Sequence, residues 1–196
     1  MNYLGHAYLS LNNADITTGN LIGDHVKGML ALQHYPDGIR RGILLHRFID
    51  SYVDSHPSVA RAKLLFRQDY GLYAGAILDT LFDHFLANDP RCFPSDTDLK
   101  TFTHQVYQSV ESNNQYLPAP FAAYFQHMKE HNWLFGYKSL VGMQRALAGL
   151  HRRARHMPDP SQAYTIFVSS YYQLNQCYFE FIDDLQKQVS AKVASM

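Results

Sequence analysis

One histidine and two aspartates share a face of a segment with helical periodicity. His46, Asp50 and Asp54 follow one another at intervals of four residues, and each such step rotates only about 40° around an α-helix. Ionised carboxylates are costly to bury unless they are paired or coordinate a metal. The spacing therefore indicates a bound cation and, with it, metal-assisted hydrolysis. The alternative for His46 and Asp50 is a partly exposed ion pair, which stabilises a helix only weakly.

A second segment carries acids and a histidine in an apolar run, residues 76–86. Asp79 and Asp83 repeat the four-residue spacing. His84 points about 100° away from Asp83, so both line one pocket only if it lies between their directions. The alternative for Asp79 is an exposed helix acid. For Asp54 the spacing leaves three roles open: a ligand, an acid that supports a ligand, or a solvated residue at the helix end.

Two further candidates lie near the N-terminus. Asp24 closes the segment 19–24, whose glycines permit close backbone approach, although it could also pair with Lys27 or an arginine. His6 is a lone histidine in an apolar segment, where a hydrogen-bonded core histidine is the usual explanation. Taken jointly, acids and histidines recur on several apolar helices. We therefore expect a divalent cation bound by Asp24, His46, Asp50 and Asp83, with His6, Asp79 and His84 as ligands or beside the ligands.

Other polar residues are less informative. Histidines 104, 127, 131, 151 and 156 have no partnered acid at metal-binding spacing. Residues 151–156 form a short basic run. This run is either a solvated helix end, where cations are favoured by the helix dipole, or a docking site for an acidic partner.

Length and composition favour one globular domain spanning residues 1–196. The chain is 46% hydrophobic and 17% charged, and its 17 basic residues balance 17 acidic ones. This balance argues against bulk binding to nucleic acid or to a membrane. The two cysteines offer no disulfide framework. Neither a signal peptide nor an apolar run of membrane-spanning length is apparent, so we expect a cytoplasmic protein.

The elements that must position these residues are predicted to be helices, because apolar residues recur at helical spacing almost throughout. No strand pattern stands out, so the predicted fold is all-α, a single-domain multi-helix bundle. The expected helices cover residues 3–12, 18–32, 37–55, a segment opened by Pro57, 73–88, 96–112, 121–131, 138–154 and 162–192, the last bending or breaking.

Four segments, residues 1–6, 19–24, 42–50 and 78–86, together resemble the acyl carrier protein phosphodiesterase family, also called acyl carrier protein hydrolases. The resemblance extends in order and spacing over nearly the whole chain, and the N-terminal half is the more distinctive. It implies an enzyme that removes 4'-phosphopantetheine from holo-acyl carrier protein. It also implies a manganese-dependent protein related to the all-helical HD-type metal phosphohydrolases.

This implied chemistry fits the candidate residues. Mixed carboxylate and imidazole ligands suit Mn²⁺, whereas a site richer in carboxylates would suit Mg²⁺ or another divalent cation. The carrier protein is an acidic partner, and Arg40, Arg41 and Arg47 are candidates for binding it or the phosphate. One departure is that the chain has no literal His-Asp dipeptide; the adjacent pairs run in the order Asp24-His25 and Asp83-His84.

Two other functions remain open on the sequence. The chain could be an HD-type metal phosphohydrolase that acts on a small nucleotide or phosphate ester. It could instead be a non-catalytic helical module that binds a metal or the carrier protein. The second alternative predicts a closed, fully coordinated site, because a catalytic metal keeps open positions.

Overall fold

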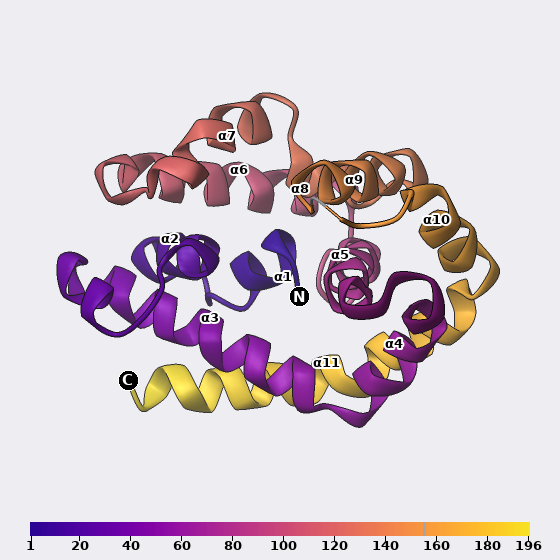
Figure 1. Cartoon of the computed structure of the whole chain (residues 1–196). Coiled ribbons are helices and arrows are strands. Elements are labelled where there is room, and N and C mark those ends of the chain that lie inside the picture. Colours follow the sequence, from indigo (N-terminus) through magenta and orange to yellow (C-terminus); the bar gives the residue numbers. More distant parts are fainter. Residues whose placement is uncertain (155) are drawn as a thin grey trace.

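The computed structural model describes residues 1–154 and 156–196, and it confirms the all-α prediction (Figure 1). Within these residues there is no strand, and no helix is long and apolar enough to cross a membrane. The α-helices are α1 (Tyr3–Tyr8), α2 (Ala14–Ile22), α3 (Asp37–Ser55), α4 (Pro57–Tyr70), α5 (Ala74–Ala87), α6 (Asp96–Ser112), α7 (Ala119–Glu130), α8 (Trp133–Gly136), α9 (Leu140–Arg153), α10 (Pro160–Ser169) and α11 (Tyr171–Ala194). The 3-10 turns are η1 (Gly23–His25), η2 (Leu30–His34), η3 (Gly71–Tyr73) and η4 (Asn114–Tyr116).

The short helix α1 lies in the middle of the fold. It packs against α2 on one side and α5 on the other (Figure 1). In the same view α6 and α7 lie above it, while α3 and α11 lie below. Large rings fill much of the surrounding core, and the fully buried ones are Phe66, Phe82, Phe121, Phe125, Phe167, Tyr178 and Phe181. Helix α1 contacts Asn20 of α2 through the side chain of His6, and Asp83 of α5 through backbone N–H groups.

Helices α2 and α3 cross at close range because glycines face each other at the crossing. A Cβ atom on Gly19 would lie 2.0 Å from the carbonyl oxygen of Ile39, and one on Gly42 would lie 2.3 Å from that of Ile16. The close approach expected of the segment 19–24 is thus realised. It brings the polar groups of α2 within hydrogen-bonding reach of the side chains that α3 presents.

Several predicted helix boundaries agree with the structure. The helices expected at 37–55 and 96–112 have those bounds, and α4 begins at Pro57. The start of α6 is fixed by a capping box in which the side chains of Ser95 and Asp98 each accept the other's backbone N–H. Such reciprocal capping satisfies donors that the first helical turn leaves free, so it defines the boundary sharply.

Other predicted boundaries were wrong. The helix expected at 18–32 ends at Ile22 and is followed by η1 and η2, and Gly28 between these turns has φ +78°. Glycine adopts this backbone conformation readily, so the chain turns there instead of continuing as a helix. The first helix stops at Tyr8 rather than residue 12, and α8 was not predicted. The long C-terminal segment does break, as expected, at Ser170 between α10 and α11.

Candidate metal centre

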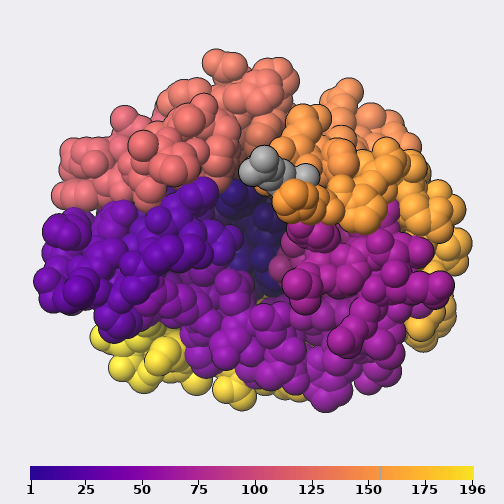
Figure 2. All heavy atoms as spheres, viewed as in Figure 1, coloured from indigo at the N-terminus to yellow at the C-terminus, as the bar shows by residue number. Residues whose placement is uncertain are grey.

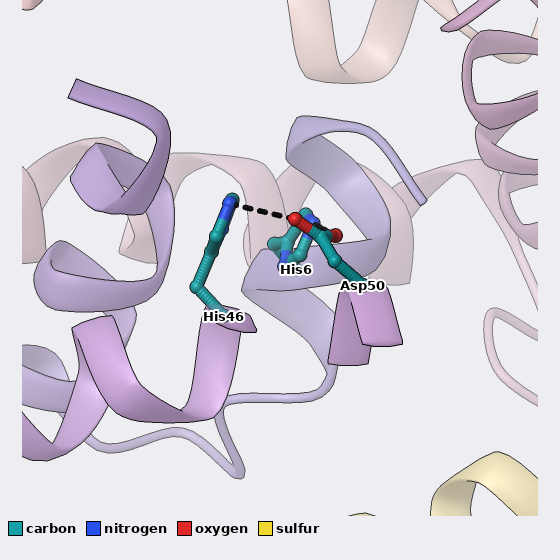
Figure 3. A group of neighbouring side chains, drawn as sticks. All are labelled: His6, His46 and Asp50. Atoms are coloured by element: carbon teal, nitrogen blue, oxygen red, sulfur yellow. Dashed lines mark ion pairs between the residues drawn. The ribbon is translucent and has the colours of Figure 1, made fainter. Parts of the chain in front are cut away.

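Three side chains from α1 and α3 meet on one side of the α1–α3 contact (Figure 3). One potential ligand atom from each of His6, His46 and Asp50 lies within 4.8 Å of the others. The two oxygens of Asp50 are divided between the rings: Oδ1 is 3.2 Å from Nε2 of His6, and Oδ2 is 3.1 Å from Nε2 of His46. The two imidazoles stack with centroids 4.2 Å apart. One carboxylate therefore faces the outward nitrogens of both histidines.

Asn20 of α2 orients both rings from behind. Its side-chain nitrogen donates to the backbone oxygen of His6 at 2.7 Å and to Oγ of Ser10 at 3.0 Å. Its side-chain oxygen, 2.8 Å from Nδ1 of His6, therefore accepts from that ring. Nδ1 of His46 lies 2.7 Å from the backbone oxygen of Asn20, which can only accept. Both neutral rings consequently carry hydrogen on Nδ1 and present the lone pair of Nε2 to Asp50.

The outward nitrogen of His46 is the least satisfied atom of the group. Nε2 is buried and has no hydrogen-bond partner. Oδ2 of Asp50 and Oδ1 of Asp24 lie 3.1 and 3.5 Å from it, within ion-pair distance if the ring is protonated, but not in hydrogen-bonding geometry. A lone pair beside two carboxylates is unfavourable unless a proton or a metal cation lies among them. We call His6, Asp24, His46 and Asp50 the histidine–carboxylate centre.

The centre has a buried side and an open side. The side chain of His6 is 5% exposed, whereas Asp50 is 41% exposed and Asp24, on η1, is 73% exposed. Figure 2 shows the surface hollowed over the N-terminal segment, between the segment that carries η1 and the one that carries α5. Solvent and solutes can therefore reach the carboxylates while the imidazoles stay fixed in the core.

The charges of the centre are coupled. Burial lowers the pKa of His46, but Asp24 and Asp50 outweigh it and raise that pKa to about 9. Burial raises the pKa of Asp50, but His46 and His6 lower it well below its usual range. Burial and the neighbouring His46 lower the pKa of His6. In the absence of a cation, one proton on His46 is thus the charge that balances the carboxylates.

Two residues of this arrangement were missed by sequence reasoning. Asn20 was passed over because an amide on an apolar helix carries no titratable signal, although its place in the Gly19–Asp24 segment was visible. Gly23 leaves room for the ring of His46, since a Cβ atom there would lie 2.3 Å from Cγ of that histidine. Asn20 acts through the α2–α3 contact and Gly23 through the contact of η1 with α3, and the spacing of residues along one helix discloses neither contact.

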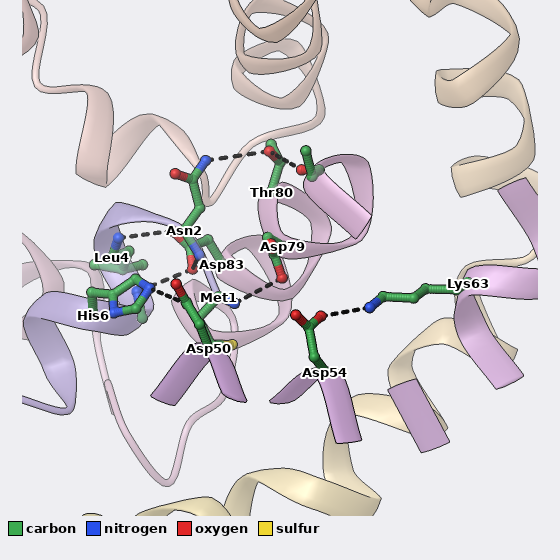
Figure 4. A network of polar contacts seen from close by, with 12 residues as sticks. Met1, Asn2, Leu4, His6, Asp50, Asp54, Lys63, Asp79, Thr80 and Asp83 are labelled. Atoms are coloured by element: carbon green, nitrogen blue, oxygen red, sulfur yellow. Dashed lines mark hydrogen bonds and ion pairs between the residues drawn. The ribbon is translucent and has the colours of Figure 1, made fainter. Parts of the chain in front are cut away.

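The structure does not bring Asp83 to the centre. It is fully buried, and its carboxylate accepts backbone N–H groups from Asn2 at 3.1 Å, Leu4 at 2.7 Å and Gly5 at 3.0 Å (Figure 4). These donors include first-turn N–H groups of α1, which have no partner within a helix. Burial raises the pKa of Asp83 to about 7, against the opposing effect of the N-terminal amine and these three donors. Asp83 therefore fixes α1 in place rather than facing the imidazoles.

The remaining candidates from the second segment also have other partners. Nδ1 of His84 lies 2.7 Å from the backbone oxygen of Tyr137, and Nε2 lies 3.0 Å from the hydroxyl of Tyr171. Asp79 pairs with the amino group of Met1 at 2.8 Å (Figure 4). The expected convergence of Asp83, His84 and Asp79 on the cation is therefore not found.

Asp54, whose role the sequence left open, forms an ion pair with Lys63 at 2.7 Å, and its side chain is 71% exposed (Figure 4). Of the three roles left open for it, this geometry matches the solvated residue at the helix end.

The three candidate arginines of α3 also have partners away from the centre. Arg47 donates to backbone oxygens of the 26–28 loop at 2.9 and 3.0 Å, so it braces the chain just after η1. Arg40 pairs with an acid of its own helix, and Arg41 donates to a carbonyl near the end of α11. A substrate-binding role for these arginines remains a prediction.

A second group of possible ligands lies on α7 and just after it. His127, Glu130 and His131 are exposed, and one ligand atom from each lies within 4.8 Å of the others. The expectation that these histidines lack a partnered acid was therefore wrong, because Glu130 reaches them from the same helical turn. Unlike the histidine–carboxylate centre, this group has no buried member.

Comparison with known proteins points to one family, because the matching family model and the similar proteins carry the same name. The model of a family described as "Acyl carrier protein phosphodiesterase" matches residues 1–185. A protein of that name from Photorhabdus laumondii is 28% identical over 193 residues, covering 98% of this chain and 96% of the relative. One from Serratia proteamaculans is 27% identical over 192 residues, covering 98% and 99%. No solved structure matches the chain, so the likeness to HD-type phosphohydrolases stays a prediction.

Proposed function

This chain belongs to the acyl carrier protein phosphodiesterase family, and on that premise we propose that it is a metal-dependent phosphodiesterase. Its substrate is holo-acyl carrier protein, and its products are the apo protein and 4'-phosphopantetheine. The scissile bond joins phosphorus to the oxygen of a serine in the carrier protein. Water supplies the oxygen that replaces the serine on phosphorus, and the serine leaves as a free hydroxyl.

The observation that carries this proposal is the orphaned nitrogen of His46. Nε2 is buried without a hydrogen-bond partner and faces the carboxylates of Asp50 and Asp24. Nε2 of His6, whose ring stacks on that of His46, lies 3.2 Å from Oδ1 of Asp50. Two imidazole nitrogens and two carboxylates directed at one region form a donor set that suits a divalent cation.

The residues that would hold the cation are His6, His46 and Asp50, with Asp24 on the exposed side. Mixed nitrogen and oxygen donors favour Mn²⁺ among the candidates, and Mg²⁺ would prefer a site with more oxygens. When bound, a divalent cation polarises a phosphoryl oxygen and lowers the pKa of a coordinated water. The hydrogen bonds from both rings to Asn20 fix which nitrogen each histidine presents, and such support raises metal affinity.

Asp24 is the ionised carboxylate at the mouth of the centre. The imidazole of His46 lowers the pKa of this carboxyl below its usual value, so Asp24 is ionised at neutral pH. It is also the most exposed member of the centre at 73%. These properties suit an outer ligand of the cation at the mouth of the site, with the buried imidazoles behind it.

The open side of the centre favours a catalytic role over a purely structural one. A structural metal site closes all of its coordination positions with protein ligands, whereas a catalytic site leaves room for water and substrate. Here Asp50 and Asp24 keep 41% and 73% of their side-chain surface exposed. An arm that projects from another protein's surface could reach carboxylates placed this way.

Intact-protein mass spectrometry tests the proposal. Purified holo-carrier protein incubated with the enzyme and Mn²⁺ should lose the mass of phosphopantetheine, and a chelator should prevent the loss. A panel of free phosphodiesters provides the comparison, because a small-molecule phosphohydrolase would act on those instead. If the holo-carrier remains intact in the presence of folded, metal-loaded enzyme, the proposed activity is wrong.

A further inference from the structure

A pocket of about 490 Å³ opens beside the start of α1 and is not part of the histidine–carboxylate centre. Its walls come from the N-terminal segment, α7, α8 and α9. The residues used below are Tyr3, Trp133, Tyr137, Arg145, Gly149, Arg152 and Arg153. We call it the α9 pocket. Its volume falls within the range of small-molecule sites, roughly 300–1,000 Å³.

Three arginines of α9 line this pocket without a partner. Arg145, Arg152 and Arg153 are exposed, and within the described part of the chain none has an ion pair or a hydrogen bond to a side chain or carbonyl. By contrast, Arg61 and Arg91 each pair with a carboxylate. Unpaired guanidinium groups around a concave site favour an anionic ligand. Arg155, from the same basic run, lies outside the described residues.

Small residues keep the pocket open beneath these arginines. A Cβ atom on Gly149 would meet only the guanidinium nitrogens of Arg152 and Arg153, at 3.7 Å. Gly142 has a different role, because its Cβ would lie 1.8 Å from the carbonyl oxygen of Gly136 and would push α8 away from α9. Gly149 is thus a position where a side chain could fill the pocket without disturbing the helix contacts.

Aromatic residues connect the pocket to the centre. Trp133 lines the pocket and stacks on Tyr124, with the ring planes 6° apart. The hydroxyl of Tyr124 lies 2.6 Å from that of Tyr3 and 3.0 Å from Nε2 of His25, the neighbour of Asp24. Tyr3 itself lines the pocket and precedes His6 by three residues, about one helical turn. The pocket and the centre therefore share the same short helix.

The charge of Arg153 also reaches this connection. Burial raises the pKa of Tyr3, and the guanidinium of Arg153 partly offsets the rise. The positive charge of Arg153 is therefore felt at Tyr3, one helical turn before His6 of the centre.

We propose that the α9 pocket binds the 4'-phosphopantetheine arm, with the amide chain against Trp133 and Tyr137 and the negative phosphate end at the mouth of the pocket, between the α9 arginines and the cation that the centre would hold. This inference rests on the proposed function, which supplies the arm as substrate. A narrow, flexible chain fits a concave pocket with an aromatic wall, whereas a protein surface requires a broader and flatter contact.

The test uses free 4'-phosphopantetheine and Trp133, the only tryptophan in the chain. The full-length protein is kept in chelator, which prevents turnover and any metal binding by the exposed His127 and His131. Titration should give a saturable change in tryptophan fluorescence. Pantetheine without the phosphate should bind at least about tenfold more weakly, because it lacks the charge that the arginines meet.

Gly149→Leu fills the pocket, and Gly75→Leu is its matched control. Gly75 is also helical, and its Cβ would meet only the end of the flexible Lys63 side chain, at 3.6 Å. Gly149→Leu should weaken phosphopantetheine binding and raise KM for holo-carrier at least about tenfold, while Gly75→Leu changes neither. If the fluorescence of Trp133 does not change when phosphopantetheine is added, the KM of Gly149→Leu for holo-carrier alone decides whether the pocket binds the arm.

The two proposals fail in different ways. Hydrolysis of holo-carrier with a normal KM in Gly149→Leu would overturn the pocket assignment and leave the activity standing. A raised KM only in Arg152→Gln and Arg145→Gln, with Gly149→Leu normal, would overturn it in favour of docking by the carrier protein's acidic surface. Binding of the arm without any hydrolysis of holo-carrier would support the pocket and refute the proposed activity.

Discussion

Two helices of this protein each carry a histidine and an aspartate among apolar residues, yet the two pairs differ in how far their polar atoms are hydrogen-bonded. On α3, Nε2 of His46 is buried without a hydrogen-bond partner and faces two carboxylates. On α5, both ring nitrogens of His84 have oxygen partners, and Asp83 accepts three backbone N–H groups. The α5 pair is saturated by the fold, whereas the α3 pair is left with unused coordinating atoms.

This difference shows that saturation of hydrogen bonds, rather than residue type, separates the two regions. A buried polar atom without a partner is costly, so a fold retains one where another ligand compensates. Asp83 and His84 have no such need and serve as structural links between α5, α1 and the segment after α8. The following predictions test the contrast by changing corresponding atoms in the two regions.

The largest contrast is expected from matched Asp→Asn substitutions. Asp50→Asn replaces an oxygen that faces a histidine of the proposed centre, so carrier-protein hydrolysis should fall by more than about 100-fold, beyond the effect of losing an outer partner of a metal site. Above about pH 9, where His46 no longer holds its extra proton, the unfolding free energy of this variant should change by less than about 1 kcal/mol, because the carboxylate is partly exposed. Initial rates and denaturant titration measure the two effects. The hydrolysis rate of Asp83→Asn, compared per folded molecule, should stay within about tenfold of the parent rate. Equal losses of hydrolysis rate in both variants would contradict the contrast between the two regions.

Stability should respond in the reverse order. Asp83→Ala leaves the N–H groups of Asn2, Leu4 and Gly5 without their acceptor in the core. At about 1–3 kcal/mol for each unsatisfied buried group, the free energy of unfolding should fall by roughly 3 kcal/mol or more. Chemical denaturation measures it, with Asp54→Ala as an exposed control of similar size change. A loss below about 1 kcal/mol would mean that Asp83 does not anchor α1.

Asn20 offers a finer test within the proposed centre. Asn20→Ala removes the side-chain oxygen that orients His6, while the backbone oxygen that orients His46 remains. Loss of such an outer partner should weaken metal binding by about 10–100-fold. Isothermal titration with Mn²⁺ gives the affinity, and Ser10→Ala controls for the neighbouring hydrogen bond to the Asn20 amide. Unchanged affinity in Asn20→Ala would exclude His6 as an oriented ligand.

The smallest predicted effect is on pH dependence. In the metal-free protein, Asp24 and Asp50 overcome burial and raise the pKa of His46 from 6.5 to about 9. A raised pKa means that the folded state binds the proton more tightly, so this stabilisation is complete below about pH 6.5 and is lost as pH rises to about 9. Metal-free protein should therefore lose stability across that window, and Asp50→Asn should flatten the loss. Thermal unfolding at several pH values measures it; a flat profile in the parent would contradict the charge assignment.

The sequence predicted the elements better than their contacts. The bounds of α3 followed from local signals, and the four-residue spacing of His46 and Asp50 correctly placed both on one helical face. Asp83 has the same spacing relationship to Asp79, yet its partners are backbone groups of α1, about 80 residues away in sequence. Spacing along a helix identifies a face but does not identify what packs against it.

The same limit explains His6 and Asn20. His6 was left between a core histidine and a ligand, because both alternatives place an imidazole in an apolar segment. Only the close α2–α3 crossing brings Asn20 behind both rings and determines which nitrogen each presents. The end of α2 at Ile22 was also missed, although this turn places Asp24 beside His46.

The most direct test of the central claim is the position of manganese in a crystal. Anomalous scattering from crystals of the full chain soaked in Mn²⁺ should give a peak within coordination distance of Nε2 of His6, Nε2 of His46 and the carboxylate of Asp50. No peak should appear beside Asp83 or His84, whose polar atoms already have partners. A peak at the α5 pair, or a peak only at the exposed His127 and His131 with none at His46, would contradict the account.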